Sequence, residues 1–248
     1  MRRRLLLGPL AAATLAPVTA AQATPRLVLF ENGPWLTRIR GDAAAPSVDG
    51  ETPIFALYDD GLVLYLERLA DLRVAYRQVR LSRTAVAEQV IDAALFEALF
   101  TQLERYYNAA EGQQARTVST LLVHALPRTK RIRVDGNLRT STIAFTRVPR
   151  ALIALILRLA DFRAPGAAPW MPQAVELTFT PAGAAASILD WTPPTSADPR
   201  APLVLTAAQY NTLRARVHGR ANAAVRLAGR TWNFRVRFVI PGEELWLR

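Results

Sequence analysis

The chain has 248 residues, of which 31 are Lys or Arg and 20 are Asp or Glu, giving a formal net charge of +11. It contains no Cys, which excludes disulfides, Cys-ligated metal sites and a cysteine nucleophile. This length allows one large domain or two small ones. The basic balance favours anionic partners, although an excess of Arg beside abundant Ala also follows from compositional bias alone.

The first 23 residues have the three parts of a secretory signal peptide. A basic start at 2–4 precedes an apolar stretch at 5–20 and the small-residue cleavage pattern Ala21-Gln22-Ala23. Two prolines make the apolar stretch a poor membrane span, and no Cys follows it to carry a lipid anchor. We expect cleavage after Ala23 and an exported, soluble protein, periplasmic or extracellular, with no membrane span. Export by the general secretory route and by the twin-arginine route both stay open.

A strand at Arg26–Phe30 opens the mature chain, and an irregular connector runs from there to residue 52. The clearest local unit follows, with two β-rich runs at Pro53–Tyr58 and Leu62–Leu66. Asp59-Asp60-Gly61 joins them, and Asp and Gly tolerate the positive φ angles of a tight turn. These residues therefore predict a β-hairpin.

The remaining elements are predicted from apolar periodicity, capping residues and turn residues. In chain order they are a strand at 72–81, a helical region at 84–107 broken near Asp92, a hairpin at 118–125 and 130–134, a helix at 150–162, a strand at 174–180, a helix capped by Thr206, and a hairpin at 224–227 and 231–240.

This order lacks the regular alternation of a parallel doubly wound sheet. It predicts an α+β fold with antiparallel sheets and helices packed on one face, in one or two sub-domains. Pro and Gly cluster at 164–172, which indicates a boundary there. The expected division is a signal peptide at 1–23, an N-terminal strand and connector at 24–52, a first α+β domain at 53–165, and a second, smaller α+β segment at 170–248.

Several short motifs resemble an uncharacterised family of bacterial exported proteins, often lipoproteins, that carry a domain of unknown function. The motifs are the Pro53–Gly61 hairpin, Leu81-Ser82, Val148-Pro149-x-x-Leu152, Trp170-Met171-Pro172, Gly229-Arg230-Thr231-Trp232 and Pro241-Gly242-Glu243-x-x-Trp246. The resemblance covers most of residues 53–246 and implies export and this fold. It implies no activity, cofactor or catalytic residue, and this chain departs from the lipoprotein members by lacking the anchoring Cys.

Four carboxylates are the candidate catalytic residues, namely Asp59, Asp60, Glu243 and Glu244. Paired carboxylates serve acid–base catalysis when they converge in a cleft and one has a raised pKa. Asp59 and Asp60 also have a sufficient structural role in the turn before Gly61, and we favour that interpretation. No metal site and no cofactor is expected.

The two histidines, His124 and His218, belong to no metal-binding motif. The apolar surroundings of His124 indicate a partly buried structural residue, and His218 stands at a predicted helix end, where a cation is favourable. A triad of Ser119, His124 and Asp135 can be assembled on paper, but such assemblies exist in any sequence.

Arg128, Lys130, Arg131 and Arg133 form a basic cluster on the second hairpin. The cluster predicts a docking patch for an anionic partner, while the alternative is a solvated strand edge that charge protects from aggregation. Nucleic-acid binding is not expected. In Trp232–Phe238 the period of two places aromatic residues and arginines on opposite faces, so the aromatic residues enter the core.

The sequence thus favours an exported soluble protein with a binding or interaction role in the bacterial cell envelope. Its expected partner is an anionic envelope component or an acidic protein. The alternative is a carboxylate-dependent periplasmic hydrolase, and an inhibitor-like module also stays open.

Overall fold

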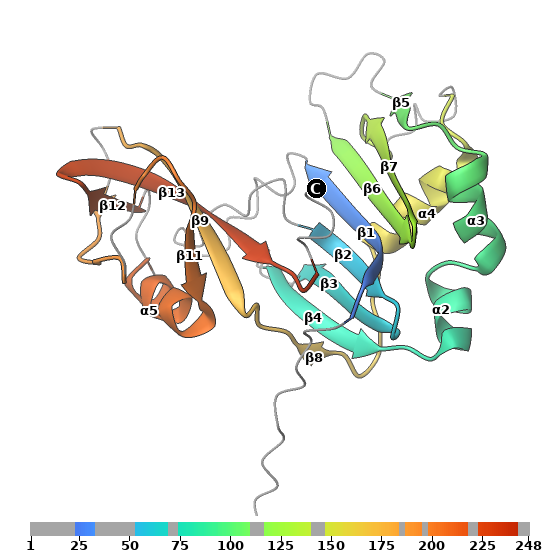
Figure 1. The fold of residues 1–248 in the computed structure, drawn as a ribbon, viewed down its shortest axis with the longest axis horizontal. Coiled ribbons are helices and arrows are strands. Elements are labelled where there is room, and N and C mark those ends of the chain that lie inside the picture. The colour runs from blue at the N-terminus through green and yellow to red at the C-terminus, as the bar shows by residue number, and fades with distance from the viewer. Residues whose placement is uncertain are drawn as a thin grey trace, which may run out of the picture.

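A computed structural model describes residues 23–32, 53–68, 74–109, 117–139, 147–183, 187–194, 198–217 and 223–242. Within these residues the fold is mostly sheet with four helices, in agreement with the predicted α+β class. Two separate sheets form, one with eight strands and one with five (Figure 1). The predicted signal peptide, except for Ala23, lies outside the described residues, as does His218.

The large sheet has the strand order β5-β7-β6-β1-β2-β3-β4-β8. Its strands are β1 (Pro25–Asn32), β2 (Pro53–Tyr58), β3 (Leu62–Arg68), β4 (Val74–Arg80), β5 (Tyr106–Asn108), β6 (Val118–Ala125), β7 (Arg128–Asp135) and β8 (Ala168–Pro169). Every side chain of β2 is buried, as its unbroken apolar sequence and its central position require.

Three helices lie on one face of the large sheet (Figure 1). They are α2 (Arg83–Gln89), α3 (Ala93–Thr101) and α4 (Arg150–Ala160). The apolar side of α4 is buried against the sheet through Leu152, Leu155, Ile156 and Leu159. Just beyond this helix, the Phe162 ring meets Phe55 and Tyr65 edge-on, at centroid distances of 5.3 and 5.1 Å.

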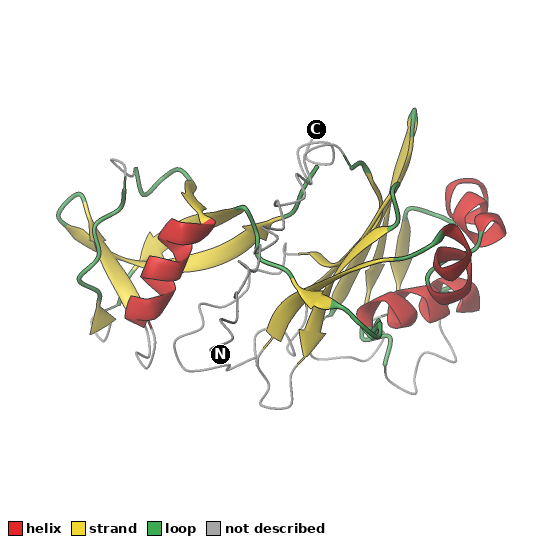
Figure 2. Cartoon of the chain, turned by 90° about the horizontal axis from the view of Figure 1, so that it is seen from below, coloured by secondary structure: helices red, strands yellow, loops and turns green. Residues whose placement is uncertain are grey.

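The small sheet has the order β10-β12-β13-β9-β11 and packs against α5 (Ala207–Val217). Its strands are β9 (Ala174–Pro181), β10 (Ser187–Ile188), β11 (Leu203–Thr206), β12 (Ala223–Leu227) and β13 (Arg230–Val239). Phe234 and Val236 enter its core, as the alternation in β13 predicts. Figure 2 shows the large sheet standing between its own helices and the small sheet.

Two predictions about local structure were wrong. The helical region does not reach residue 107, because α3 ends at Thr101 and Tyr106–Asn108 form a strand with Tyr107 buried. The sheets are also not wholly antiparallel, since β5 runs parallel to β7 and β10 runs parallel to β12. Both parallel strands are only two or three residues long, too short to show a strand period in the sequence.

The Pro- and Gly-rich segment 164–172 packs on the large sheet. β8 lies within it and pairs with β4, and the backbone N–H of Trp170 donates to the carbonyl of Tyr76 at 2.9 Å. The indole of Trp170 is buried against the Tyr76 ring at 5.3 Å. The chain therefore passes into the small sheet only at β9.

Candidate functional site

Asp59 and Asp60 hold the β2–β3 turn and its neighbours. Asp59 Oδ1 accepts from the backbone N–H of Thr24 at 3.1 Å, and its own N–H donates to the Thr24 carbonyl at 2.9 Å. Asp60 accepts from Leu62 N at 2.9 Å and from the Arg80 guanidinium at 2.8 Å. Both residues are exposed, so these contacts give each carboxylate the structural role expected of Asp in a turn.

Neither of the two pockets described below brings two candidate carboxylates together. The two pockets described below include one carboxylate each, Glu104 in the first and Asp190 in the second, and neither pocket includes Asp59 or Asp60. Glu243 and Glu244 lie outside the described residues. Over the same described part of the chain, no group of three His, Cys, Asp or Glu side chains could hold a metal ion.

His124 is a buried histidine whose Nδ1 lies 2.7 Å from Thr129 Oγ1. It cannot form a triad with Ser119 and Asp135. Ser119 is an odd number of residues from His124 on β6, so the two side chains point to opposite faces of the sheet. Asp135 pairs with Val118, at the far end of the hairpin from the His124–Thr129 pair.

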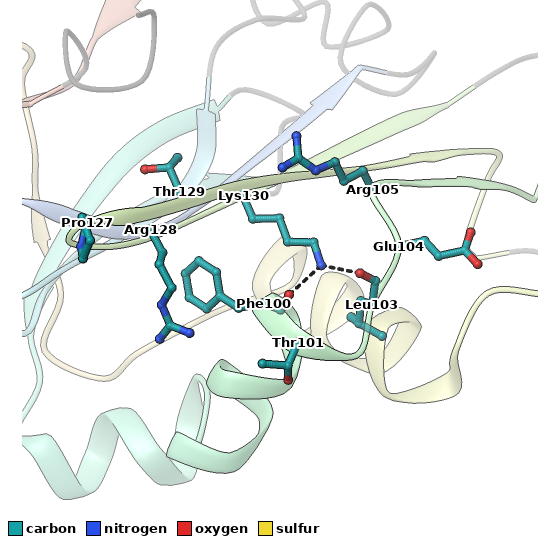
Figure 3. Close-up of a pocket in the computed structure, with 9 residues that line it drawn as sticks. All are labelled: Phe100, Thr101, Leu103, Glu104, Arg105, Pro127, Arg128, Thr129 and Lys130. Atoms are coloured by element: carbon teal, nitrogen blue, oxygen red, sulfur yellow. Dashed lines mark hydrogen bonds between the residues drawn. The ribbon is translucent and has the colours of Figure 1, made fainter.

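The predicted basic cluster is divided between the two faces of the sheet. Arg128 and Lys130 share a face with the buried Ile132 and point toward α3, as Figure 3 shows. Arg131 belongs to the opposite face, as does Arg133 two residues later. The four cations therefore do not form one continuous patch.

Arg128 is paired with a carboxylate of the same chain. Its two terminal nitrogens each lie 2.8 Å from an oxygen of Glu97 on α3, and its guanidinium stacks 4.5 Å from the centre of the Phe100 ring. The hydrogen bonds of this pair lower the pKa of Glu97 and raise that of Arg128. Both side chains are about half exposed, so a partner can still reach the outer side of the pair.

Lys130, the only lysine in the chain, binds the end of α3. Its ammonium donates to the backbone carbonyl of Phe100, at 3.1 Å, and to that of Leu103 (Figure 3). The first is an acceptor that the last turn of α3 leaves open, and the second lies just beyond the helix. Desolvation, with a second contribution from the nearby positive charge of Arg105, lowers the pKa of this ammonium.

On the other face, the two arginines differ. Arg133 is paired with Asp135 through its Nε at 2.7 Å, and this hydrogen bond raises the pKa of Arg133. The side chain of Arg131 is exposed, and the described residues provide no carboxylate partner for it. Arg131, Arg105 and Lys130, whose ammonium contacts only backbone carbonyls, are therefore the cations of this region that no described carboxylate neutralises.

Next to these cations, the outer edge of β7 is open. β5 pairs only with Arg133–Asp135, and Arg133 N donates to the Arg105 carbonyl at 2.9 Å. The backbone N–H and C=O groups of successive residues point to opposite sides of a strand, so those of Thr129 and Arg131 point to the same edge as those of Arg133. Within the part of the chain that the structure describes, no backbone group pairs with these outward groups.

A pocket of about 580 Å³ lies directly beside the open edge, between the end of α3 and the β6–β7 turn (Figure 3). Its lining combines three cations, one carboxylate, two hydroxyls and apolar surface, from Phe100, Thr101, Leu103, Glu104, Arg105, Pro127, Arg128, Thr129 and Lys130. Leu126, at the tip of the adjoining turn, is 81% exposed. We call the open edge of residues 128–131 together with this pocket the β7 groove.

A second pocket of about 360 Å³ lies between the segment that follows β10, with Asp190 and Trp191, and α5, with Gln209, Thr212 and Arg216. Arg216 is bound to the backbone carbonyl of Asp190 and lies 3.8 Å from its carboxylate. Its cation is thus held by its own chain.

Sequence reasoning identified the cations of β7 but missed Arg105 and the open edge. Arg105 falls in the stretch that the periodicity assigned to a helix, whereas the structure places it in the turn leading into β5. The alternation of Ile132 and Val134 with Arg131 and Arg133 was the signal that could have separated the two faces. No family model, no curated protein and no solved structure matches this chain.

Proposed function

We propose that this chain is an exported binding protein of the bacterial cell envelope, and that its β7 groove binds an extended acidic segment of another protein. The observation that carries the proposal is the open edge at Thr129 and Arg131 next to a pocket rich in cations. An extended peptide adds to such an edge as a further strand, with main-chain hydrogen bonds for affinity and side-chain pockets for specificity.

The size and place of the pocket support this mode of binding. Its volume of about 580 Å³ lies within the usual range of roughly 300–1,000 Å³ for ligand sites. An added strand would lie in line with β5. It would pair with the outward backbone groups of Thr129 and Arg131, as β5 pairs with those of Arg133–Asp135. Leu126 and Phe100 provide apolar contact at the two sides of its path.

The charges of the groove support an acidic partner. Arg105 and Lys130 are close enough for one cation to lower the pKa of the other, and neither forms an ion pair with a described carboxylate. Carboxylates on successive positions of an added strand point to opposite faces, so they would meet Arg128 and Lys130 on one face and Arg131 on the other. The same contacts would relieve the repulsion between Arg105 and Lys130.

Export is the second part of this proposal, and the leader at 1–23 supports it. Among the described residues, no helix is long and apolar enough to cross a membrane. We also propose that the chain from β9 onward is a sub-domain of its own, because its strands and α5 surround a hydrophobic cluster separate from that of the large sheet.

Peptide binding tests the groove. The probe is an extended peptide of repeating Glu-Glu-Thr, which carries carboxylates on both faces of a strand. A peptide of repeating Gln-Gln-Thr is its uncharged match, and both are titrated by fluorescence anisotropy at low and high salt. We expect the acidic peptide to bind and Arg131→Gln to weaken binding roughly threefold to tenfold, since one rim cation is lost. Arg131→Pro should weaken binding further, because it also removes an outward N–H without breaking the pairing with β6.

Arg226→Gln is the matched control, because Arg226 is an exposed arginine on β12 of the small sheet. It removes the same charge and should leave binding unchanged. Equal loss in the Arg226 and Arg131 variants would show non-specific attraction to a basic protein and contradict the proposal. Equal loss in Arg131→Gln and Arg131→Pro would also contradict the proposal, because the backbone N–H of residue 131 would then not contribute to binding. Tighter binding of an acidic polysaccharide than of the peptide would contradict it too, because a polysaccharide cannot pair with the strand edge as a further strand.

A further inference from the structure

Thr24 is bound to Asp59 through both of its backbone groups. The backbone nitrogen of Thr24 lies 3.1 Å from Asp59 Oδ1, and its carbonyl accepts from Asp59 N at 2.9 Å. Directly after Thr24, Pro25 pairs with Tyr58 at the end of β1, so this contact fixes the place where the chain joins the large sheet.

The peptide bond before Thr24 is also where the small-residue pattern predicts cleavage of the leader. Hydrolysis of that bond adds one water, leaves the new carboxylate on Ala23 and turns the nitrogen of Thr24 into a free amine. We infer that Asp59 is the built-in acceptor for this new terminus, so that processing converts a neutral N–H contact into an ion pair between the Thr24 ammonium and the Asp59 carboxylate.

The surrounding charges favour this pairing. The neighbouring carboxylate, Asp60, is already bound to Arg80 and to Leu62 N, so Asp59 is the one bound to the Thr24 nitrogen. The nearby cation of Arg26 stacks on the Phe96 ring at 4.7 Å. The segment at Pro241 and Gly242 packs against the same place without adding a charge. There the Tyr58 hydroxyl donates to the Pro241 carbonyl at 3.0 Å.

The pair also has a defined dependence on pH. An unperturbed α-amine has a pKa of about 8, and a nearby carboxylate raises that pKa in the folded state. The folded form then binds the proton more tightly than the unfolded form does. The extra stability is therefore complete below pH 8 and is lost as the pH rises through the raised pKa.

The first measurement is the terminus itself. Intact-mass analysis of the protein recovered from the envelope fraction of a bacterium expressing the full chain should give a chain that begins at Thr24. A chain that begins at any other residue would overturn the inference, since the ammonium would then be displaced from Asp59.

The second measurement is the coupling between the terminus and Asp59. Two purified forms, one beginning at Thr24 and one at Ala21, are compared with and without Asp59→Asn by urea unfolding at pH 6.5. Asp59→Asn should raise the unfolding constant about twofold to fivefold more in the Thr24 form than in the Ala21 form. The difference should disappear at pH 9.5, where the amine is neutral.

Asp60→Asn is the matched control, because it removes the same charge from the next residue of the same turn. It should affect both forms equally. Equal effects of Asp59→Asn in the two forms would overturn the inference. The inference rests on the proposed export but not on the β7 groove, so peptide binding by the Thr24 form reports separately on the groove.

Discussion

At the scale of single residues, Gly61 and Gly229 show why two similar turns tolerate substitution differently. Both have positive φ angles, +80° and +76°, which L-residues adopt only at a cost. A Cβ on Gly61 would lie 2.3 Å from the Leu81 carbonyl oxygen, whereas a Cβ on Gly229 would meet nothing within 4 Å. The β2–β3 turn is therefore packed against the start of the helical layer, and the β12–β13 turn is open.

We predict that Gly61→Ala lowers the free energy of unfolding by about 3 kcal/mol, because it adds a backbone clash to the cost of the left-handed conformation. Gly229→Ala should cost about 1 kcal/mol, from the conformation alone. Urea unfolding of both variants checks the prediction. Equal losses would show that the contact with Leu81 does not constrain the turn.

Residue roles that depend on near neighbours could be predicted from the sequence, and those that depend on distant ones could not. The Asp-Asp-Gly turn follows from local chemistry, and the structure confirms the hairpin. The bond of Asp59 to Thr24 joins residues 35 positions apart, and Arg128 meets Glu97 across 31 positions. Such pairs are set by how the elements pack, which no local pattern contains.

At the scale of elements, Asp92 separates two helices that the apolar periodicity alone would join. Its carboxylate accepts from Leu95 N at 2.8 Å and caps α3, while α2 ends at Gln89 with Val90 buried just beyond it. Ser82 caps α2 in the same way, at 3.1 Å from Ala85 N. The sequence predicted a cap at Ser82 and only a break near Asp92, although Ser and Asp are both preferred at N-cap positions.

We predict that Asp92→Ala lowers the free energy of unfolding by about 1 kcal/mol, the usual value of an N-cap. Glu88→Ala, which removes an exposed carboxylate from α2, should change it by less than about 0.5 kcal/mol. Urea unfolding and far-UV circular dichroism check this. If the two variants were equally stable, the cap at Asp92 would carry no stability.

At the scale of the whole molecule, Phe238 connects the two hydrophobic clusters. Its ring meets Tyr76 of the large sheet and Tyr210 of α5 edge-on, each at 5.6 Å. Burial raises the pKa of Tyr76, whose hydroxyl donates to the Pro53 carbonyl. One aromatic side chain thus contributes to the packing of both sheets.

We predict that Phe238→Ala lowers the free energy of unfolding by about 2 kcal/mol and separates the unfolding of the two sheets into two calorimetric transitions. Phe179→Ala is the control, since Phe179 is partly buried against the small cluster only. It should shift one transition and leave the other unchanged. A single, equally cooperative transition in both variants would contradict a coupling role for Phe238.

The order of elements along the chain could be predicted from the sequence, whereas the order of strands in the sheets could not. Period-two alternation and turn residues indicate where strands occur, and most of the predicted strands are confirmed. Which strands become neighbours depends on long-range pairing, as for β1 between β2 and β6 or β5 beside β7. The β7 groove exists only because of that pairing.

The central position of β1 has a consequence for folding kinetics. The register pairs Leu27 with Val123, so the large sheet closes only after the ends of a long loop have met. Closing this loop costs conformational entropy before the strand contacts that offset the cost have formed. Sheets with such long-range pairing therefore fold slowly, in milliseconds to seconds. Until β6 arrives, one edge of β1 stays open, which makes the half-folded chain the species most exposed to aggregation and to chaperone capture.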